Sequence, residues 1–180
     1  MHQKGMSKAT SNLSFRLMAL SFKLRDWVLP RRRILREVGI RRGDRVLDYG
    51  CGPGSYIGPL AELVGEEGRI YALDLHPLAL QMVQRIALRK GLKNVETIPS
   101  DCKTGLPGES IDVVLLYDVL HELSSKDDVL RELHRVLKPQ GVLSVMDHHM
   151  KEGEVVSAVT GGGLFRLLKK GKRTLSFCKA

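Results

Sequence analysis

Three glycines at alternate positions carry the clearest chemical signal in the sequence. Gly50, Gly52 and Gly54 directly follow the apolar run 45–49. Glycine lets a backbone turn tightly and approach a ligand where a Cβ atom would clash. Asp74 ends the next apolar run, and a carboxylate at the tip of a neighbouring parallel strand can accept hydrogen bonds from both hydroxyls of a ribose. These residues predict a nucleoside site.

A second group of reactive side chains lies further along the chain. His121 is a candidate general base because histidine titrates near neutral pH; the alternative is a histidine that holds a loop at a helix start. The run Asp147-His148-His149 contains side chains of metal-ligand type. Adjacent histidines point to opposite sides of an extended chain, however, and rarely bind one ion. We therefore expect these histidines to line a pocket or a loop, and we expect no metal.

Alternating strand and helix patterns place these residues at strand ends. Apolar runs indicate five strands, over residues 45–49, 69–74, 95–99, 111–117 and 142–146. Helical patterns cover residues 31–38, 55–64, 77–90, 124–137 and 152–159. Gly91 is expected as a C-cap, Ser124 or Ser125 as an N-cap, and the run 138–141 as the end of its helix.

The last part of the chain differs from these repeated units. Residues 164–169 and 173–179 are two strand-like runs joined by Lys170-Gly171-Lys172, which predicts a β-hairpin. Strand and helix units that close on a hairpin predict an α/β fold. We expect a seven-stranded, mostly parallel sheet with a C-terminal antiparallel hairpin and helices on both faces.

The glycine motif excludes one kind of nucleoside site and favours another. A dinucleotide fingerprint requires a further glycine at the position that Ser55 occupies. The spacing Asp-x-Gly-x-Gly-x-Gly from Asp48 resembles the first motif of the class I methyltransferases, which use S-adenosylmethionine and have a Rossmann-like sheet. The run from Ile111 to Pro139 looks like the methyltransferases of small molecules and is similar to the ubiquinone and menaquinone C-methyltransferases, although the segment after Met146 is shorter than theirs.

The resemblance implies S-adenosylmethionine as cofactor and S-adenosylhomocysteine as product. Asp74 would hold the ribose, Asp101 would accept from the adenine amine, and Cys102 would offer its backbone N–H to a ring nitrogen. Asp48 would either brace the glycine loop or receive the cofactor's ammonium group through water. The full set of expected cofactor-binding residues is Asp48, Gly50, Cys51, Gly52, Gly54, Asp74, Leu75, Ser100, Asp101, Cys102 and Tyr117.

The same resemblance places the acceptor beside the end of the strand 111–117. Asp118 and His121 follow that strand and are the catalytic candidates. No Asp/Asn-Pro-Pro-Tyr tetrapeptide occurs there, which argues against amino methylation of DNA bases or protein amides. The expected acceptor is a small molecule that is apolar or membrane-associated, quinone-like or lipid-like.

The basic charge of the chain is concentrated at its start. The 180 residues carry a formal net charge of +9; residues 1–45 hold 12 Lys and Arg against 3 Asp and Glu, and residues 46–180 hold 17 of each. Residues 13–29 show leucines at helical spacing with basic residues between them. We divide the chain into a basic amphipathic arm, residues 1–30, and a methyltransferase domain, residues 31–180. The arm either packs over the domain as a lid or lies on an anionic membrane surface.

The composition of the chain bears on its location in the cell. No run reaches the ~18 consecutive apolar residues of a membrane span, and no signal peptide is recognisable. Cys51, Cys102 and Cys178 lack the spacing of a zinc site or disulfide framework. We expect a cytoplasmic protein, with peripheral membrane contact through residues 13–29 as an open alternative; the sequence leaves the oligomeric state open.

Two other functions compete with small-molecule methylation. An RNA methyltransferase would use the arm for phosphate contacts, but the arm offers only three aromatic side chains for stacking, Phe15, Phe22 and Trp27, so a nucleic-acid partner is disfavoured. A binding module would keep the fold and the cofactor without turnover.

Overall fold

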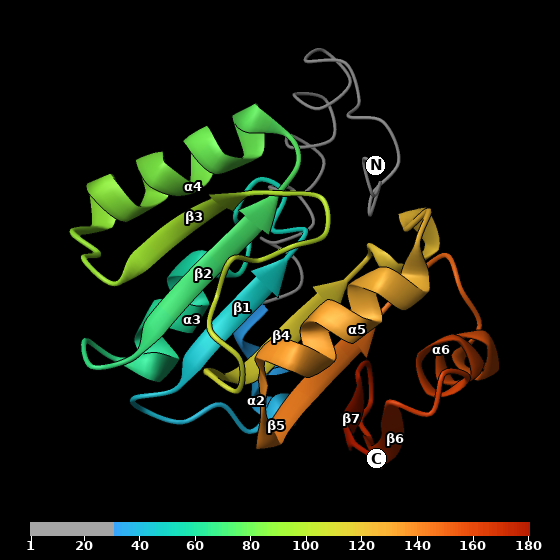
Figure 1. The fold of residues 1–180 in the computed structure, drawn as a ribbon. Coiled ribbons are helices and arrows are strands. Elements are labelled where there is room, and N and C mark those ends of the chain that lie inside the picture. Colours follow the sequence, from blue (N-terminus) through green and yellow to red (C-terminus); the bar gives the residue numbers. More distant parts are fainter. Residues whose placement is uncertain (1–30) are drawn as a thin grey trace.

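A seven-stranded sheet runs through residues 31–180, the part of the chain that the computed structural model describes (Figure 1). The spatial order of its strands is β3-β2-β1-β4-β5-β7-β6. Strands β1 to β5 pair in parallel, whereas β7 is antiparallel to both β5 and β6. The strands are β1 (Arg45–Tyr49), β2 (Arg69–Asp74), β3 (Val95–Pro99), β4 (Ile111–Tyr117), β5 (Leu137–Met146), β6 (Phe165–Lys170) and β7 (Leu175–Lys179). The predicted fold class is confirmed.

Helices cover both faces of this sheet (Figure 1). One face carries α2 (Arg31–Val38), α3 (Ile57–Val64) and α4 (Pro77–Lys90). The other carries α5 (Lys126–Val136) and α6 (Glu152–Thr160), and a short 3₁₀ turn, η1 (Leu120–Glu122), follows β4. The predicted arm, residues 1–30, lies outside the described residues, so its role as a lid or membrane contact stays a prediction.

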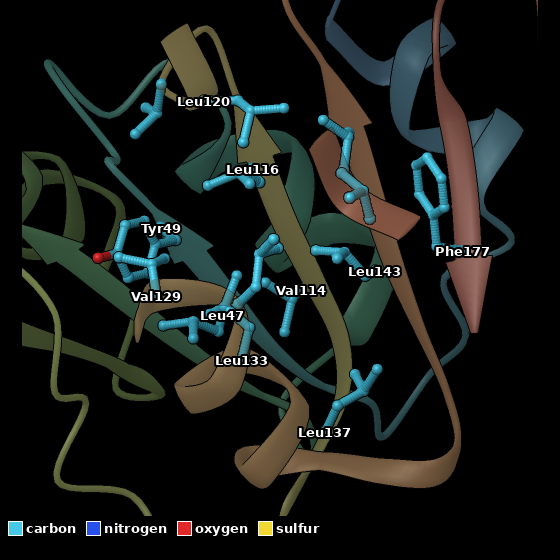
Figure 2. Close-up of a cluster of buried hydrophobic side chains, with 14 of the residues drawn as sticks. Leu47, Tyr49, Val114, Leu116, Leu120, Val129, Leu133, Leu137, Leu143 and Phe177 are labelled. Atoms are coloured by element: carbon cyan, nitrogen blue, oxygen red, sulfur yellow. The ribbon is translucent and has the colours of Figure 1, made fainter. Parts of the chain in front are cut away.

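The core explains why the strands keep this register. Leu47 and Tyr49 of β1 point to the α5 face, whereas Val46 points to the α2 face, as the two-residue period of a strand requires. In β4, Val114 and Leu116 pack under α5 (Figure 2) and Leu115 packs on the opposite side. A one-residue slip would exchange the two buried sets. The carboxyl ends of β1, β2 and β4 therefore meet at one edge of the sheet.

The ends of α5, α6, β6 and β7 differ from the sequence prediction by one or two residues, and two further boundaries differ for a clear structural reason. Helix α3 begins at Ile57 rather than at residue 55, because residues 52–56 form a turn and Tyr56 makes no side-chain capping bond. Strand β5 begins directly after α5, at Leu137, where we expected a loop. Ile111 pairs with Leu137 and Val113 pairs with Val142, so the segment between them is absorbed as an irregularity within the strand.

The predicted helix caps have opposite outcomes. Gly91 has a φ of +64° and caps α4 in the left-handed conformation, which confirms that prediction. Ser125 occupies the N-cap position of α5, but its side chain makes no capping hydrogen bond. The helix then relies on Asp127 and Asp128 in its first turn, where carboxylates interact favourably with the helix dipole.

Candidate functional site

The glycine loop after β1 joins the ends of three strands. The amides of Gly50 and Cys51 both donate to the carbonyl of Leu73 in β2, at 2.8 and 2.9 Å. Gly50 has a φ of +74°, and a Cβ atom added there would lie 2.3 Å from Cγ2 of Val119, which follows β4. Only glycine accommodates both this conformation and this close approach. The loop is therefore held between β2 and the chain segment that leaves β4.

Asp74 closes the glycine loop from the end of β2. Its Oδ2 accepts a hydrogen bond from the amide of Gly52 at 2.9 Å, and its Oδ1 accepts one from the amide of His76 at 2.7 Å. Burial raises the pKa of Asp74 even though these amides favour the carboxylate. Each carboxylate oxygen retains a second lone pair. Asp74 therefore braces the loop and keeps acceptor capacity for a bound hydroxyl.

Asp48 presents a buried carboxylate oxygen without a hydrogen-bond partner among residues 31–180. Its side chain is buried, and within residues 31–180 no hydrogen-bond partner meets Oδ2. Burial, with a smaller contribution from the negative charge of Asp74, raises the pKa of Asp48 to about 7. Buried polar atoms are normally hydrogen-bonded, and an unpaired one calls for an explanation. A cationic group bound beside the glycine loop would satisfy this atom, which fits a cofactor that carries an ammonium group.

Residues after β3 approach the same edge of the sheet. The amide of Ser100 donates to the carbonyl of Asp74 at 3.3 Å. The hydroxyl of Tyr49 in β1 donates to the carbonyl of Asp101 at 2.9 Å. The amide of Cys102, which we expected to donate to adenine, donates instead to Oγ of Ser100 at 3.2 Å. The structure brings the residues after β3 close to the glycine loop. A bound adenine could accept from the Cys102 amide only by displacing the bond to Ser100.

Three predicted residues adopt different degrees of burial. Leu75 is half-buried beside Asp74. Cys51 is buried, and burial raises the pKa of its thiol well above the usual range, so it is a neutral packing residue. Tyr117 is also buried, with its hydroxyl 2.9 Å from Oγ of Ser144 in β5 and its ring edge against Tyr56. The hydroxyl of Tyr117 is thus engaged inside the core.

Two aspartate–histidine pairs connect the ends of β4 and β5. His121 Nδ1 lies 2.9 Å from Oδ2 of Asp147, and the His121 amide donates to the same oxygen at 3.1 Å. In the reverse direction, His148 Nδ1 lies 2.6 Å from Oδ1 of Asp118. The His149 ring stacks on His121 with centroids 4.3 Å apart. Each strand end therefore supplies one carboxylate and one imidazole to the other.

The charge state of the first pair follows from its contacts. Partial burial disfavours the Asp147 carboxylate, but hydrogen bonds from the His121 ring and from the amides of His149 and His121 outweigh it and lower the pKa of Asp147. An ionised Asp147 accepts from Nδ1–H, which leaves the lone pair of His121 on Nε2. Nε2 lies 3.6 Å from Oε1 of Glu122. The pair can therefore remove a proton from a bound group. His121 was predicted from the sequence, but its partner Asp147 was not.

Asp118 adopts an uncommon backbone conformation in the second pair. Its φ is +55°, and its amide donates to the carbonyl of Met146 at 2.7 Å. Left-handed conformations of non-glycine residues cost free energy and recur at functional sites.

Within residues 31–180 there is no group of three or more His, Cys, Asp or Glu side chains that could hold a metal ion.

Comparison with known proteins identifies this arrangement. A family model described as a methyltransferase domain matches residues 40–175. The chain belongs to this methyltransferase family. A solved S-adenosylmethionine-dependent methyltransferase from Aquifex aeolicus superposes with a TM-score of 0.81 at 26% identity, covering 95% of this chain and 98% of that one. The predicted resemblance to the class I methyltransferases and the predicted cofactor, S-adenosylmethionine, are supported by these matches.

Within the family, the chain is similar to curated methyltransferases of menaquinone and ubiquinone biosynthesis. The demethylmenaquinone methyltransferase of Geobacillus stearothermophilus is 33% identical over 113 residues, which are 62% of this chain and 48% of that protein. The ubiquinone/menaquinone biosynthesis C-methyltransferase UbiE of Pseudoalteromonas translucida is 29% identical over 142 residues, which are 78% of this chain and 57% of that protein. The chain spans about half the length of the curated relatives that it matches.

Proposed function

We propose that this methyltransferase domain transfers the methyl group of S-adenosylmethionine to a small, apolar acceptor of quinone-like chemistry. The observation that supports the cofactor assignment is Oδ2 of Asp48, which has no hydrogen-bond partner within residues 31–180 and is buried beside a glycine loop that Asp74 closes. The acceptor class rests on the relatives, which are named for demethylmenaquinone and for ubiquinone and menaquinone biosynthesis.

Residues from three strand ends would hold the cofactor. Asp48 would accept from its ammonium group, the glycine loop would lie along its chain, and Asp74 would accept from its ribose hydroxyls. Leu75 and the run Ser100–Cys102 would flank its base. When bound, S-adenosylmethionine supplies a methyl group on a positively charged sulfur, already activated for transfer. The protein then has mainly to position the acceptor and exclude water.

The histidine pair would prepare the acceptor. A phenol-like or quinol-like acceptor becomes a stronger nucleophile when it loses a proton. His121 would take that proton on Nε2, because Asp147 fixes the ring with Nδ1 protonated. Asp147 would also stabilise the imidazolium that results, as a carboxylate beside an imidazole does in other proton-transfer sites. Asp118 and His148 would complete the wall between cofactor and acceptor.

Calorimetric titration tests the cofactor assignment first. We expect saturable binding of S-adenosylmethionine and S-adenosylhomocysteine and no binding of NADH. The variant Asp74→Ala should lose about 1–3 kcal/mol of cofactor affinity, because a charged acceptor is removed. Binding of NADH, or unchanged affinity in a folded Asp74→Ala protein, would refute the assignment. Methyl transfer to 1,4-naphthohydroquinone, followed by mass spectrometry, would distinguish an enzyme from a binding module of the same fold.

The role of the arm requires a separate experiment. Among residues 31–180 no helix is both long and apolar enough to cross a membrane. We propose that residues 13–29 make the peripheral membrane contact or the lid described above. Sedimentation of the full chain with anionic vesicles, compared with a chain lacking residues 1–29, separates these roles. Loss of RNA binding rather than vesicle binding on truncation would support the RNA alternative.

A further inference from the structure

A pocket of about 320 Å³ lies beside the aspartate–histidine pairs, between the end of β5, the start of α6 and the turn of the β6–β7 hairpin. Met146, Val155 and Leu175, all buried, give it an apolar floor. Asp147 and His148 line the same pocket. Its volume is at the low end of the ~300–1,000 Å³ of ligand sites, which suits a small ring system better than a long chain.

The hairpin turn at the rim of this pocket is fixed in place. Oε2 of Glu37 in α2 accepts hydrogen bonds from the amide of Arg173 at 3.0 Å, from the amide of Thr174 at 3.3 Å and from Oγ1 of Thr174 at 3.2 Å. Leu175 pairs with Val145, so the turn lies beside the carboxyl end of β5. The turn therefore presents its side chains from a defined position.

The rim carries positive charge that carboxylates of residues 31–180 only partly neutralise. Lys170 pairs with Glu152 across the pocket at 2.7 Å. In the described part of the chain, neither the ammonium group of Lys172 nor the guanidinium group of Arg173 pairs with a carboxylate, although both residues line the pocket. The acidic pocket residue Asp147 has its side chain fully covered and bonded to His121.

Charge is also segregated within the domain. Residues 164–180 contain six Lys and Arg and no Asp or Glu, whereas the rest of the domain, residues 31–163, contains 18 Lys and Arg against 19 Asp and Glu. The net positive charge of the domain thus resides in the hairpin. A field of this kind attracts an anion to the hairpin.

We infer that the acceptor of this domain is a small aromatic anion, with its ring on the apolar floor and its acidic substituent on Lys172 and Arg173. This inference rests on the proposed methyl transfer and changes its acceptor from a wholly apolar molecule to an apolar ring that carries one acidic group. A carboxylate or an acidic hydroxyl on a quinone-like ring has the required chemistry, since charged groups form the stronger hydrogen bonds with ammonium and guanidinium donors. The ring would then lie against the wall formed by Asp147 and His148.

A pair of fluorescent probes that differ by one carboxylate tests this inference. We would measure binding of 1-hydroxy-2-naphthoate and of 1-naphthol to the full chain with saturating S-adenosylhomocysteine. The wild-type protein should bind the naphthoate at least about tenfold more tightly, as expected for a charge-assisted contact. Lys172→Ala and Arg173→Ala should each remove most of that preference and leave 1-naphthol binding unchanged. The preference should also shrink as salt rises, because exposed charges are screened.

Arg166→Ala provides the matched control. Arg166 is an exposed cation on the same hairpin, but it does not line the pocket. Its removal lowers the net charge by the same amount and should leave the preference intact. Equal binding of the two probes, binding of neither, or a preference that survives both pocket substitutions would overturn the inference. Calorimetry with S-adenosylmethionine tests the proposed function independently, so failure of one is distinguishable from failure of the other.

Discussion

Asp147, which follows β5, holds the ring of His121, which follows β4, through a hydrogen bond of 2.9 Å. The two residues are 26 positions apart and meet because Tyr117 and Met146, the last residues of the two parallel strands, pair in register. The second pair, Asp118 with His148, crosses in the opposite direction. A carboxylate with a covered side chain thus orients an imidazole that is a quarter exposed.

The first prediction concerns this contact. Asp147→Asn should lower the rate of methyl transfer roughly 100-fold, the lower end of what general base catalysis contributes, while cofactor affinity stays unchanged. His121→Ala and the double variant should cost about the same, because residues that act as a unit are not additive.

The control for that prediction is His134→Ala. The His134 ring is on α5 and contacts Phe165, away from the strand ends that carry the two pairs. Its activity should match the wild type. An Asp147→Asn protein with full activity would show that Asp147 only supports the loop.

The second prediction separates stability from function at Asp48. Its pKa is raised to about 7, above the ordinary 3.8, so the folded state retains a proton that the unfolded chain loses. The wild type therefore loses stability as pH rises from about 4 to 7, and the loss stays constant above that range. Asp48→Asn should be more stable than the wild type at pH 8 by on the order of 2 kcal/mol, and the difference should vanish near pH 4.

The same Asp48→Asn protein should bind S-adenosylmethionine at least about tenfold more weakly, because it offers the cofactor's ammonium group no negative charge. Urea unfolding at several pH values and calorimetry on one preparation measure both effects. A variant that is destabilised and also binds poorly would instead indicate a structural role for Asp48.

Local sequence signals were sufficient for most elements of the fold. β1, β2, β3, β4 and α4 have the predicted bounds, because glycine or proline borders β1, β2 and α4 and a nearly continuous apolar run marks the buried strand β4. The early start of β5 was not predictable in this way. Lys-Pro-Gln-Gly has the composition of a loop, and only pairing with β4 draws it into the sheet.

The candidate site was also only partly predictable from the sequence. Gly50, Gly52 and Asp74 were predicted to meet, since a glycine loop and a strand-end carboxylate have local signatures. The pairing of His121 with Asp147 depends on which strands are neighbours and in what register, and no local pattern encodes that relationship. The capture of the Cys102 amide by Ser100 depends on one side-chain rotamer, which sequence does not specify.

The third prediction compares two glycines that share a backbone conformation. Gly50 and Gly91 have φ values of +74° and +64°, but an added Cβ would clash with Val119 in the first case and meet no atom of residues 31–180 within 4 Å in the second. Gly91→Ala should cost about 1 kcal/mol of unfolding free energy, for conformation alone. Gly50→Ala should cost about 3 kcal/mol, because the clash with Val119 adds to the cost of the left-handed conformation. Equal costs in urea unfolding would mean that the loop moves freely away from Val119.

The fourth prediction concerns Glu132, which ties the segment after β3 to α5. One of its oxygens accepts from the amide and the hydroxyl of Thr104, at 2.8 and 2.7 Å, and Arg135 binds both oxygens. Arg135 also donates to the carbonyl of Leu106 at 2.9 Å. Hydrogen bonds from Arg135 and then Thr104 outweigh partial burial and lower the pKa of Glu132 from 4.5 to about 2.

The contribution of Glu132 to the free energy of unfolding depends on pH. A carboxyl whose pKa is lower in the folded state contributes its full stability above the unfolded value of 4.5 and loses it as pH falls toward 2. Glu132→Gln should therefore be less stable than the wild type at pH 7 by about 1–2 kcal/mol, an amount discounted for the exposure of Arg135. The difference should narrow steadily below about pH 4.5. Glu96→Gln, on the exposed side of β3, should stay within about 0.5 kcal/mol of the wild type. Urea unfolding between pH 7 and the lowest pH at which the chain still folds measures the difference, and a gap that is independent of pH would contradict the assignment.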